Sequence, residues 1–205
     1  MSPELNAVLQ LLVRWFHIFF GIVWIGHLYF FNFVNVPFQG GLDKELKPKV
    51  NPPLILRALY WFRWGAMFTF IFGWTLFVLL YWPMGGYLFD ADGGISRRGM
   101  WMLFGVTLGT IMWINVWFVI WPLQKKILGG MLGGPAAPPE LAKRAGLFSR
   151  INTYLSAPML VGMIAGSHSD VWTVMPVWMH GLFIVIGLGA IHGLIKSSFK
   201  VKTTL

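Results

Sequence analysis

The chain has 205 residues, of which 57% are hydrophobic and only 11% are charged, whereas soluble domains carry about 25% charged residues. This composition excludes an ordinary soluble domain and is typical of a helical bundle that faces lipid. The net charge of +9 does not indicate nucleic-acid binding, because the basic residues lie beside apolar stretches, where they meet lipid headgroups. The absence of cysteine excludes an iron–sulfur cluster held by cysteine and covalent haem c in this chain.

Five apolar stretches are long enough to cross a bilayer, which takes roughly 20 residues. These stretches cover residues 8–36, 59–82, 99–121, 147–166 and 171–195. We therefore predict an all-α integral membrane protein, with residues 1–205 forming one domain, a bundle of five transmembrane helices. Pro37, Pro83 and Pro122 are expected to end the first three. The N-terminal stretch has no basic region and no small-residue cleavage site, so we expect a retained first span and no cleaved signal.

The connecting segments set the expected orientation. Thirteen of the sixteen Lys and Arg residues lie on one side. Eleven are in the segments between spans one and two, between spans three and four, and after span five, and Arg63 and Arg150 lie at the adjoining rims of spans two and four. The positive-inside rule then predicts an external N-terminus and a cytoplasmic C-terminus in a bacterial inner membrane. Residues 40–53 are expected to be irregular or a short helix, and residues 129–139, rich in Gly and Pro, a flexible linker.

Histidines inside the apolar stretches are the main candidates for chemistry, because an imidazole in a membrane usually has a partner or a metal. His17 and His180 fall at a common depth in two helices that run in the same direction, at about 1.5 Å per residue. This is the arrangement that a haem b with two histidine ligands needs. We predict these two residues as axial ligands, with His168 as the substitute for His180 and with Arg14 pairing a propionate.

His27 and His192 share a second level and form an alternative inner site. On each helix the two histidines are offset by about 80° to 120°, a poor arrangement for two stacked haems, so one haem is expected. Other interpretations stay open: His27 forms a hydrogen bond to a neighbouring helix, and His192 lies in the headgroup zone. His168 is then a solvated loop residue.

Other polar residues in the spans have simpler interpretations. Gly21 and Gly187 lie near the predicted ligands and would either accommodate a porphyrin or permit close helix packing. We expect interhelical hydrogen bonds from four asparagines: Asn32, Asn35, Asn115 and Asn152. No span has a carboxylate at mid-depth, which disfavours a proton-driven transporter.

Three segments resemble a known family. They are residues 14–26, with RWFH followed by GIVWIG, residues 121–126, WPLQKK, and residues 149–159, SRINTYLSAPM, continuing to His168. They are similar to the urate oxidase N-terminal domain family, the membrane domains of bacterial urate hydroxylases. The resemblance implies a membrane oxidoreductase that passes electrons to a cytochrome c domain. No C-x-x-C-H motif is present, so we expect a cytochrome c partner to be a separate polypeptide.

Three functions follow from these patterns. The first is a haem b electron-transfer subunit of a respiratory or oxidoreductase complex, working with other membrane subunits and a cytochrome c or a dehydrogenase. The second is an enzyme that oxidises a purine such as urate in a pocket near His17, Arg14, Arg97 and Arg98. The third is a non-catalytic membrane anchor of a respiratory or photosynthetic complex, whose histidines only pack. Whether the chain itself is an enzyme is therefore left open.

Overall fold

The structure, a computed structural model, describes residues 2–168, 176 and 178–201, without the side chains of His168 and His180. Its helices are α1 (Pro3–Tyr29), η1 (Phe30–Asn35), α2 (Val36–Gly41), α3 (Lys47–Leu80), α4 (Arg97–Ile114), η2 (Asn115–Ile120), α5 (Trp121–Met131), α6 (Pro139–His168) and α8 (Trp178–Ser198). The two η segments are π-helical turns. The described residues contain no β-strand, which agrees with the predicted all-α class.

Two helices begin at serine caps. The Ser2 side chain accepts a hydrogen bond from the Leu5 amide, and the Ser96 side chain accepts one from the Gly99 amide at 2.8 Å. Each serine satisfies one of the amides that the first turn of a helix leaves without a partner. These caps fix where α1 and α4 start.

The prediction that Pro37 and Pro122 end their spans is wrong. The chain stays helical from Pro3 to Gly41 and from Arg97 to Met131. A proline inside a helix clashes with the carbonyl four residues earlier. Here the residue before each proline, Val36 or Trp121, bonds a carbonyl five residues back. The π-helical turn thereby shifts the hydrogen-bond pattern just before the proline ring, and the helix passes through it.

Residues 40–53, predicted to be irregular or a short helix, are helical at both ends and irregular only between α2 and α3. Its last residues form the first turns of α3, and Pro52 and Pro53 lie inside that helix. The Gln39 and Asn51 side chains exchange two hydrogen bonds, at 2.6 and 3.1 Å. This amide pair holds the start of α3 against α2, a contact between side chains twelve residues apart that no local pattern reveals.

Four helical segments are long and apolar enough to cross a membrane: Pro3–Gly41, Lys47–Leu80, Arg97–Met131 and Gly181–Ser198. They correspond to the first, second, third and fifth predicted spans. The fourth predicted span lies within α6, which has 30 residues but carries charged residues along its first half. The chain is therefore an all-helical membrane protein with four candidate spans in its described part.

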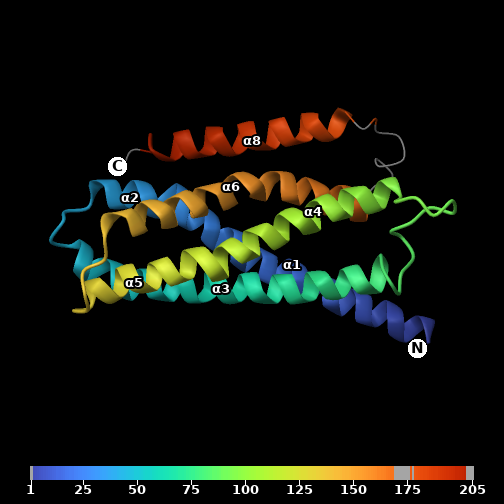
Figure 1. The fold of residues 1–205 in the computed structure, drawn as a ribbon, viewed down its shortest axis with the longest axis horizontal. Coiled ribbons are helices and arrows are strands. Elements are labelled where there is room, and N and C mark those ends of the chain that lie inside the picture. Colours follow the sequence, from blue (N-terminus) through green and yellow to red (C-terminus); the bar gives the residue numbers. More distant parts are fainter. Residues whose placement is uncertain (1, 169–175, 177, 202–205) are drawn as a thin grey trace.

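The helices pack in pairs, and glycine makes the closest contacts possible. α1 lies along α3, α4 lies along α6, and α8 lies against α6 (Figure 1). A Cβ on Gly162 of α6 would sit 2.8 Å from the Gly105 backbone of α4, and a Cβ on Gly65 would sit 3.0 Å from the Trp24 amide nitrogen. Since lipid provides no hydrophobic drive between helices, such close backbone contacts supply much of the packing energy.

The core of the bundle is apolar and its lipid-facing surface is too. Trp24, Leu28, Phe62 and Met112 are fully or almost fully buried. On the outside, large apolar side chains such as Val185 of α8 are 66% exposed. In a membrane that exposure costs nothing, because lipid tails are as apolar as these side chains.

Candidate functional site

A cavity of about 540 Å³ lies between α1, α3, α4 and α6. We call it the histidine cavity, because His17 is the one histidine among its described lining residues. Most of the lining is apolar or aromatic, and Arg14 is its one charged residue in the described part of the chain. Cavities of this size, mostly apolar with a few polar groups, are typical of sites for small molecules and cofactors.

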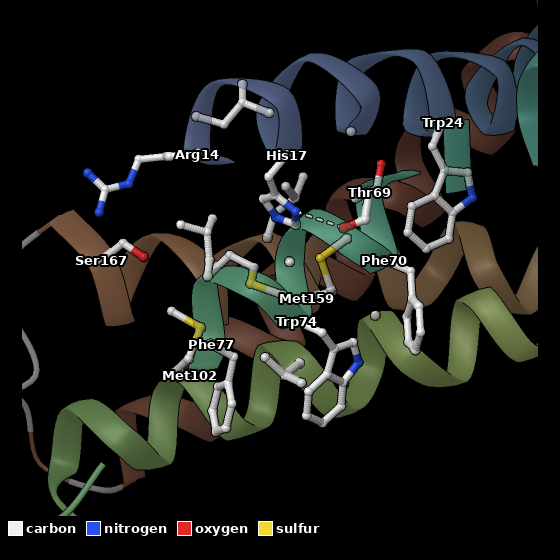
Figure 2. A pocket seen from close by; sticks show the side chains of 18 of the residues that line it. Arg14, His17, Trp24, Thr69, Phe70, Trp74, Phe77, Met102, Met159 and Ser167 are labelled. Carbon is white, nitrogen blue, oxygen red and sulfur yellow. Dashed lines mark hydrogen bonds between the residues drawn. The ribbon is translucent and has the colours of Figure 1, made fainter. Parts of the chain in front are cut away.

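His17 is held in one orientation by α3. Its Nδ1 lies 2.9 Å from the Thr69 carbonyl oxygen, 52 residues along the chain (Figure 2). Because a carbonyl can only accept, Nδ1 must donate its hydrogen, and a neutral ring then keeps the lone pair on Nε2. Nε2 has no hydrogen-bond partner among the described residues. This is the pattern of a metal-binding histidine, whose second nitrogen is fixed by a backbone carbonyl.

Gly73 makes room for the imidazole. It lies one turn after Thr69 on α3, and a Cβ at this position would sit 2.8 Å from His17 Cε1 and 3.0 Å from Nδ1. Any larger residue would therefore push the ring from its place against the helix. Sequence reasoning singled out His17 but missed Thr69 and Gly73, because nothing in a sequence shows which residue of α3 faces it.

Arg14 lies at one end of the cavity. It precedes His17 by one turn of α1, and Figure 2 shows its guanidinium and Ser167 of α6 at the same end of the site. No carboxylate occurs among the described lining residues, so the cation is available to an anionic group of a ligand. The structure therefore brings together Arg14 and His17, as the sequence predicted.

Arg98 serves a different purpose from the one considered in the sequence. Its Nε donates to the Gly166 carbonyl at 2.9 Å, and its guanidinium lies 4.0 Å from the centre of the Tyr87 ring. The buried Tyr81 hydroxyl donates to the same carbonyl. Arg98 thus ties the segment after α3 to the end of α6. Neither Arg98 nor the exposed Arg97 lines the histidine cavity.

The remaining walls contribute sulfur and aromatic rings. Met102 of α4 and Met159 and Met163 of α6 line the cavity. Trp74 and Phe77 of α3 line it too, and Figure 2 shows them with Met102 and Met159. Methionine sulfur is soft and adapts to irregular apolar surfaces, and it can also ligate haem iron. These methionines were not singled out from the sequence, where they are indistinguishable from packing residues.

Two predicted ligands fall outside the description. The side chains of His168 and His180 are not among the described residues, so their part in the site stays a prediction. Of their neighbours, Ser167 lines the histidine cavity, whereas no described residue of α8 does. Gly187 of α8 packs against Ala157 and Pro158 of α6, at 3.3–3.4 Å for an added Cβ. That glycine serves helix packing.

The alternative pair is engaged elsewhere. His27 Nδ1 lies 2.7 Å from the Val23 carbonyl oxygen of its own helix. His192 is exposed on α8, and its Nδ1 lies 2.8 Å from the Tyr154 hydroxyl of α6. Neither residue lines the histidine cavity. The predicted hydrogen bonding of asparagines is confirmed for Asn32, which donates to Ser149 Oγ at 2.9 Å, and for Asn115, which donates to Asn152 Oδ1 at 2.8 Å.

The fold and the cavity define a class of protein: a helical membrane protein in which a backbone carbonyl orients a histidine beside an apolar cavity. Comparison with protein families gives the particular group. The family model described as urate oxidase N-terminal matches residues 88–204, more than half of the chain. The chain belongs to the urate oxidase N-terminal family, as the resemblance indicated. The comparisons found no match among curated proteins and none among solved structures.

The matched region contains two of the three segments that carried the resemblance, residues 121–126 and 149–159. The segment around His17 lies before it. The family match therefore supports the membrane class and a relation to urate hydroxylase-like proteins. The chemistry of the histidine cavity has to be argued from its own geometry.

Proposed function

We propose that this chain is a haem b electron-transfer subunit of a membrane oxidoreductase complex. The observation that carries the proposal is His17, whose Nδ1 is fixed by the Thr69 carbonyl and whose Nε2 lone pair is left for a metal. The cavity around it fits the group, because it is large, apolar and aromatic, and Gly73 leaves the space that the imidazole occupies.

Three residues of the histidine cavity have a role in this proposal: His17, Arg14 and Thr69. His17 would hold the iron, and Arg14 would pair with a propionate carboxylate. When bound, haem b supplies reversible one-electron transfer at its iron. His168 or His180 would supply the second ligand. We would test His168 first, because its sequence neighbour Ser167 lines the cavity. The hydrogen bond to the Thr69 carbonyl holds the His17 ring in one orientation.

The wider setting of the proposal follows the charge pattern. The chain is a five-span bundle in a bacterial inner membrane, with α6 as the additional span and the C-terminus on the cytoplasmic side. Its redox partners are a cytochrome c or a dehydrogenase on separate polypeptides and other membrane subunits. Accessibility of a cysteine introduced near either terminus to a membrane-impermeant reagent tests this orientation.

The deciding experiment is a reduced-minus-oxidised optical spectrum of the purified protein, with haem measured per chain. We expect a b-type spectrum at about one haem per chain, lost in His17→Ala. His27→Ala is the matched control, because His27 lies on the same helix outside the cavity and should leave haem content unchanged. A colourless, folded wild-type protein, or full haem occupancy in His17→Ala, would contradict the proposal.

The family match favours a second function, a purine-oxidising membrane enzyme that works with a separate cytochrome c. In this case Arg14 would bind an anionic substrate in the histidine cavity. Oxidation of urate by the isolated protein with an artificial electron acceptor supports this function, and inactivity across purines counts against it.

A third function is a non-catalytic subunit that anchors a larger complex, in which the exposed apolar face of α8 would contact a partner subunit instead of lipid. That function predicts a colourless protein whose stability depends on its partner subunits.

A further inference from the structure

A second cavity, of about 400 Å³, is lined by residues of η1, α2, α3, α5 and the first half of α6. We call it the amide cavity. The labelled helices α2 and α5 lie at the other end of the bundle from the loop between α3 and α4 (Figure 1). Seven of the cavity's described lining residues are polar. Two are Ser149 and Arg150, and the other five carry amide side chains: Asn32, Asn35, Gln39, Asn51 and Gln124. The proposed haem function makes no use of this site.

Three of these amide side chains are held in place by hydrogen bonds within the protein. Asn32 Nδ2 donates to the Leu28 carbonyl at 3.0 Å and to Ser149 Oγ at 2.9 Å. The Gln39 and Asn51 amides bond reciprocally. Each of the paired amides still has an N–H or an oxygen lone pair that these contacts do not use. The site is therefore held in position before a ligand arrives.

Two further donors face the cavity without any partner among the described residues. Gln124 comes from α5 and Arg150 from α6, and both side chains are half-buried. No Asp or Glu occurs among the described lining residues, so the charge of Arg150 has no counter-ion in the cavity. A half-buried guanidinium needs acceptors for the N–H groups that it turns away from water. The ligand must therefore offer oxygen acceptors.

The rest of the wall is apolar and partly aromatic. The rings of Phe31 and Phe62 meet edge to face, with centroids 5.5 Å apart, and Leu59, Ile120 and Leu128 are buried beside them. Such a wall fits the faces of a planar ring. A phosphate group fits poorly, because one arginine does not offset the desolvation of an ion with two charges. The cavity thus favours a neutral ring with carbonyl oxygens at its edges.

We propose that the amide cavity binds the headgroup of a membrane quinone, a benzoquinone or a naphthoquinone. One ring carbonyl accepts hydrogen bonds from Arg150 and Gln124, and the ring faces pack against the aromatic wall. The proposal deepens the proposed electron-transfer function, on which it rests, by naming a lipid-soluble redox partner. The two cavities are close along α1 and η1, because Gly26 lines the histidine cavity and Phe31 lines the amide cavity. These two residues are about 7.5 Å apart along the helix axis.

Equilibrium binding to the full-length purified chain tests this proposal, with a short-chain benzoquinone and a short-chain naphthoquinone as probes. We expect one saturable site per chain for at least one probe. Gln124→Leu and Arg150→Met should each weaken binding by about tenfold or more, the effect of losing one hydrogen bond to a carbonyl. Arg144→Met is the matched control, since Arg144 lies on the same helix but is exposed and does not line the cavity.

The outcomes separate this inference from the haem proposal. Affinity that is equal in the wild type and in both folded variants overturns the quinone site, whether or not haem is bound. Displacement of the probe by inorganic phosphate or by vesicles of anionic lipid, at constant ionic strength, also overturns it and indicates an oxyanion site. Quinone binding to a colourless protein overturns the haem proposal alone. Loss of binding in Gln124→Leu supports the site, because this change breaks no hydrogen bond among the described residues.

Discussion

The two cavities are built on the same helices but offer opposite chemistry. The histidine cavity lies between α1, α3, α4 and α6, and the amide cavity lies between the continuations of α1 and α4 and the other halves of α3 and α6 (Figure 1). In the first, one carbonyl fixes one imidazole and leaves a lone pair. In the second, amides fix one another and leave hydrogen-bond donors. One site is therefore suited to a metal and the other to oxygen acceptors.

The difference arises from where each helix changes its geometry. The π-helical turns η1 and η2 follow the residues that line the histidine cavity and provide part of the amide cavity. A π-helical turn rotates the residues after it relative to a regular α-helix. Asn32 and Asn35 lie within η1 itself, and both line the amide cavity. Such turns are frequent at functional sites.

The largest expected effect comes from separating α4 and α6. Gly162→Leu would force a side chain into the Gly105 backbone, where a Cβ alone would sit at 2.8 Å. We expect destabilisation by about 3 kcal/mol, the upper part of the range for overpacking, with loss of the histidine cavity. Thermal unfolding in detergent, together with haem content, measures it.

Gly193→Leu is the control for this change. Gly193 lies on α8, where a Cβ would meet no atom within 4 Å. An unfolding temperature for Gly162→Leu equal to that of the control would show that the α4–α6 contact is not tight in the membrane protein.

Gly73→Ala should damage the histidine cavity alone. The added methyl would displace the His17 ring and break its alignment with Thr69, at a cost of about 2 kcal/mol in haem binding. Haem titration of the apoprotein should show affinity weakened by about thirtyfold, while quinone binding is unchanged. Gly189→Ala on α8, another helical glycine with open space around it, should change neither. Unaltered haem affinity in Gly73→Ala would mean that His17 does not hold the iron in this orientation.

The sequence predicted the fold well where composition decides it. Stretches of about 20 apolar residues identified four helices that the structure also presents as candidate spans. The ends of those helices were predicted less well, because Pro37 and Pro122 were expected to stop them. A proline rule acts on local backbone geometry, and the π-helical turns that let the helix continue depend on tertiary packing.

The site was predicted only as far as single helices allow. His17 and Arg14 are one turn apart on α1, so their common face could be read from the sequence. Thr69 and Gly73 lie more than fifty residues away, and only the packing of α1 on α3 brings them to His17. The amide cavity was missed for the same reason. Its asparagines were predicted as hydrogen-bonding groups, but the sequence does not show that they surround a space.

Asn152→Leu should weaken the packing of α6 against α4 and η2. Asn152 lines neither cavity, so the change should not act on one cavity alone. Asn152 is fully buried, accepts from Asn115 and donates to the Met112 carbonyl at 2.9 Å. The change leaves the Asn115 amide without its acceptor, at a cost of about 1 kcal/mol in unfolding free energy. A double-mutant cycle with Asn115→Leu should show coupling of similar size. Additive effects would indicate that the pair does not form in the membrane.

Arg14→Gln should give the smallest effect, and one confined to the histidine cavity. Removing a positive charge near a haem favours the more positive, oxidised iron, so the midpoint potential should fall. If Arg14 stabilises the reduced haem by about 1 kcal/mol, its removal should lower the midpoint potential by about 40 mV for one electron. Potentiometric titration measures it, and Arg144→Gln, an exposed arginine remote from the cavity lining, is the control. An unchanged potential would place Arg14 among the lipid headgroups. The histidine cavity would then differ from the amide cavity, with its Arg150, in holding its ligand through uncharged groups.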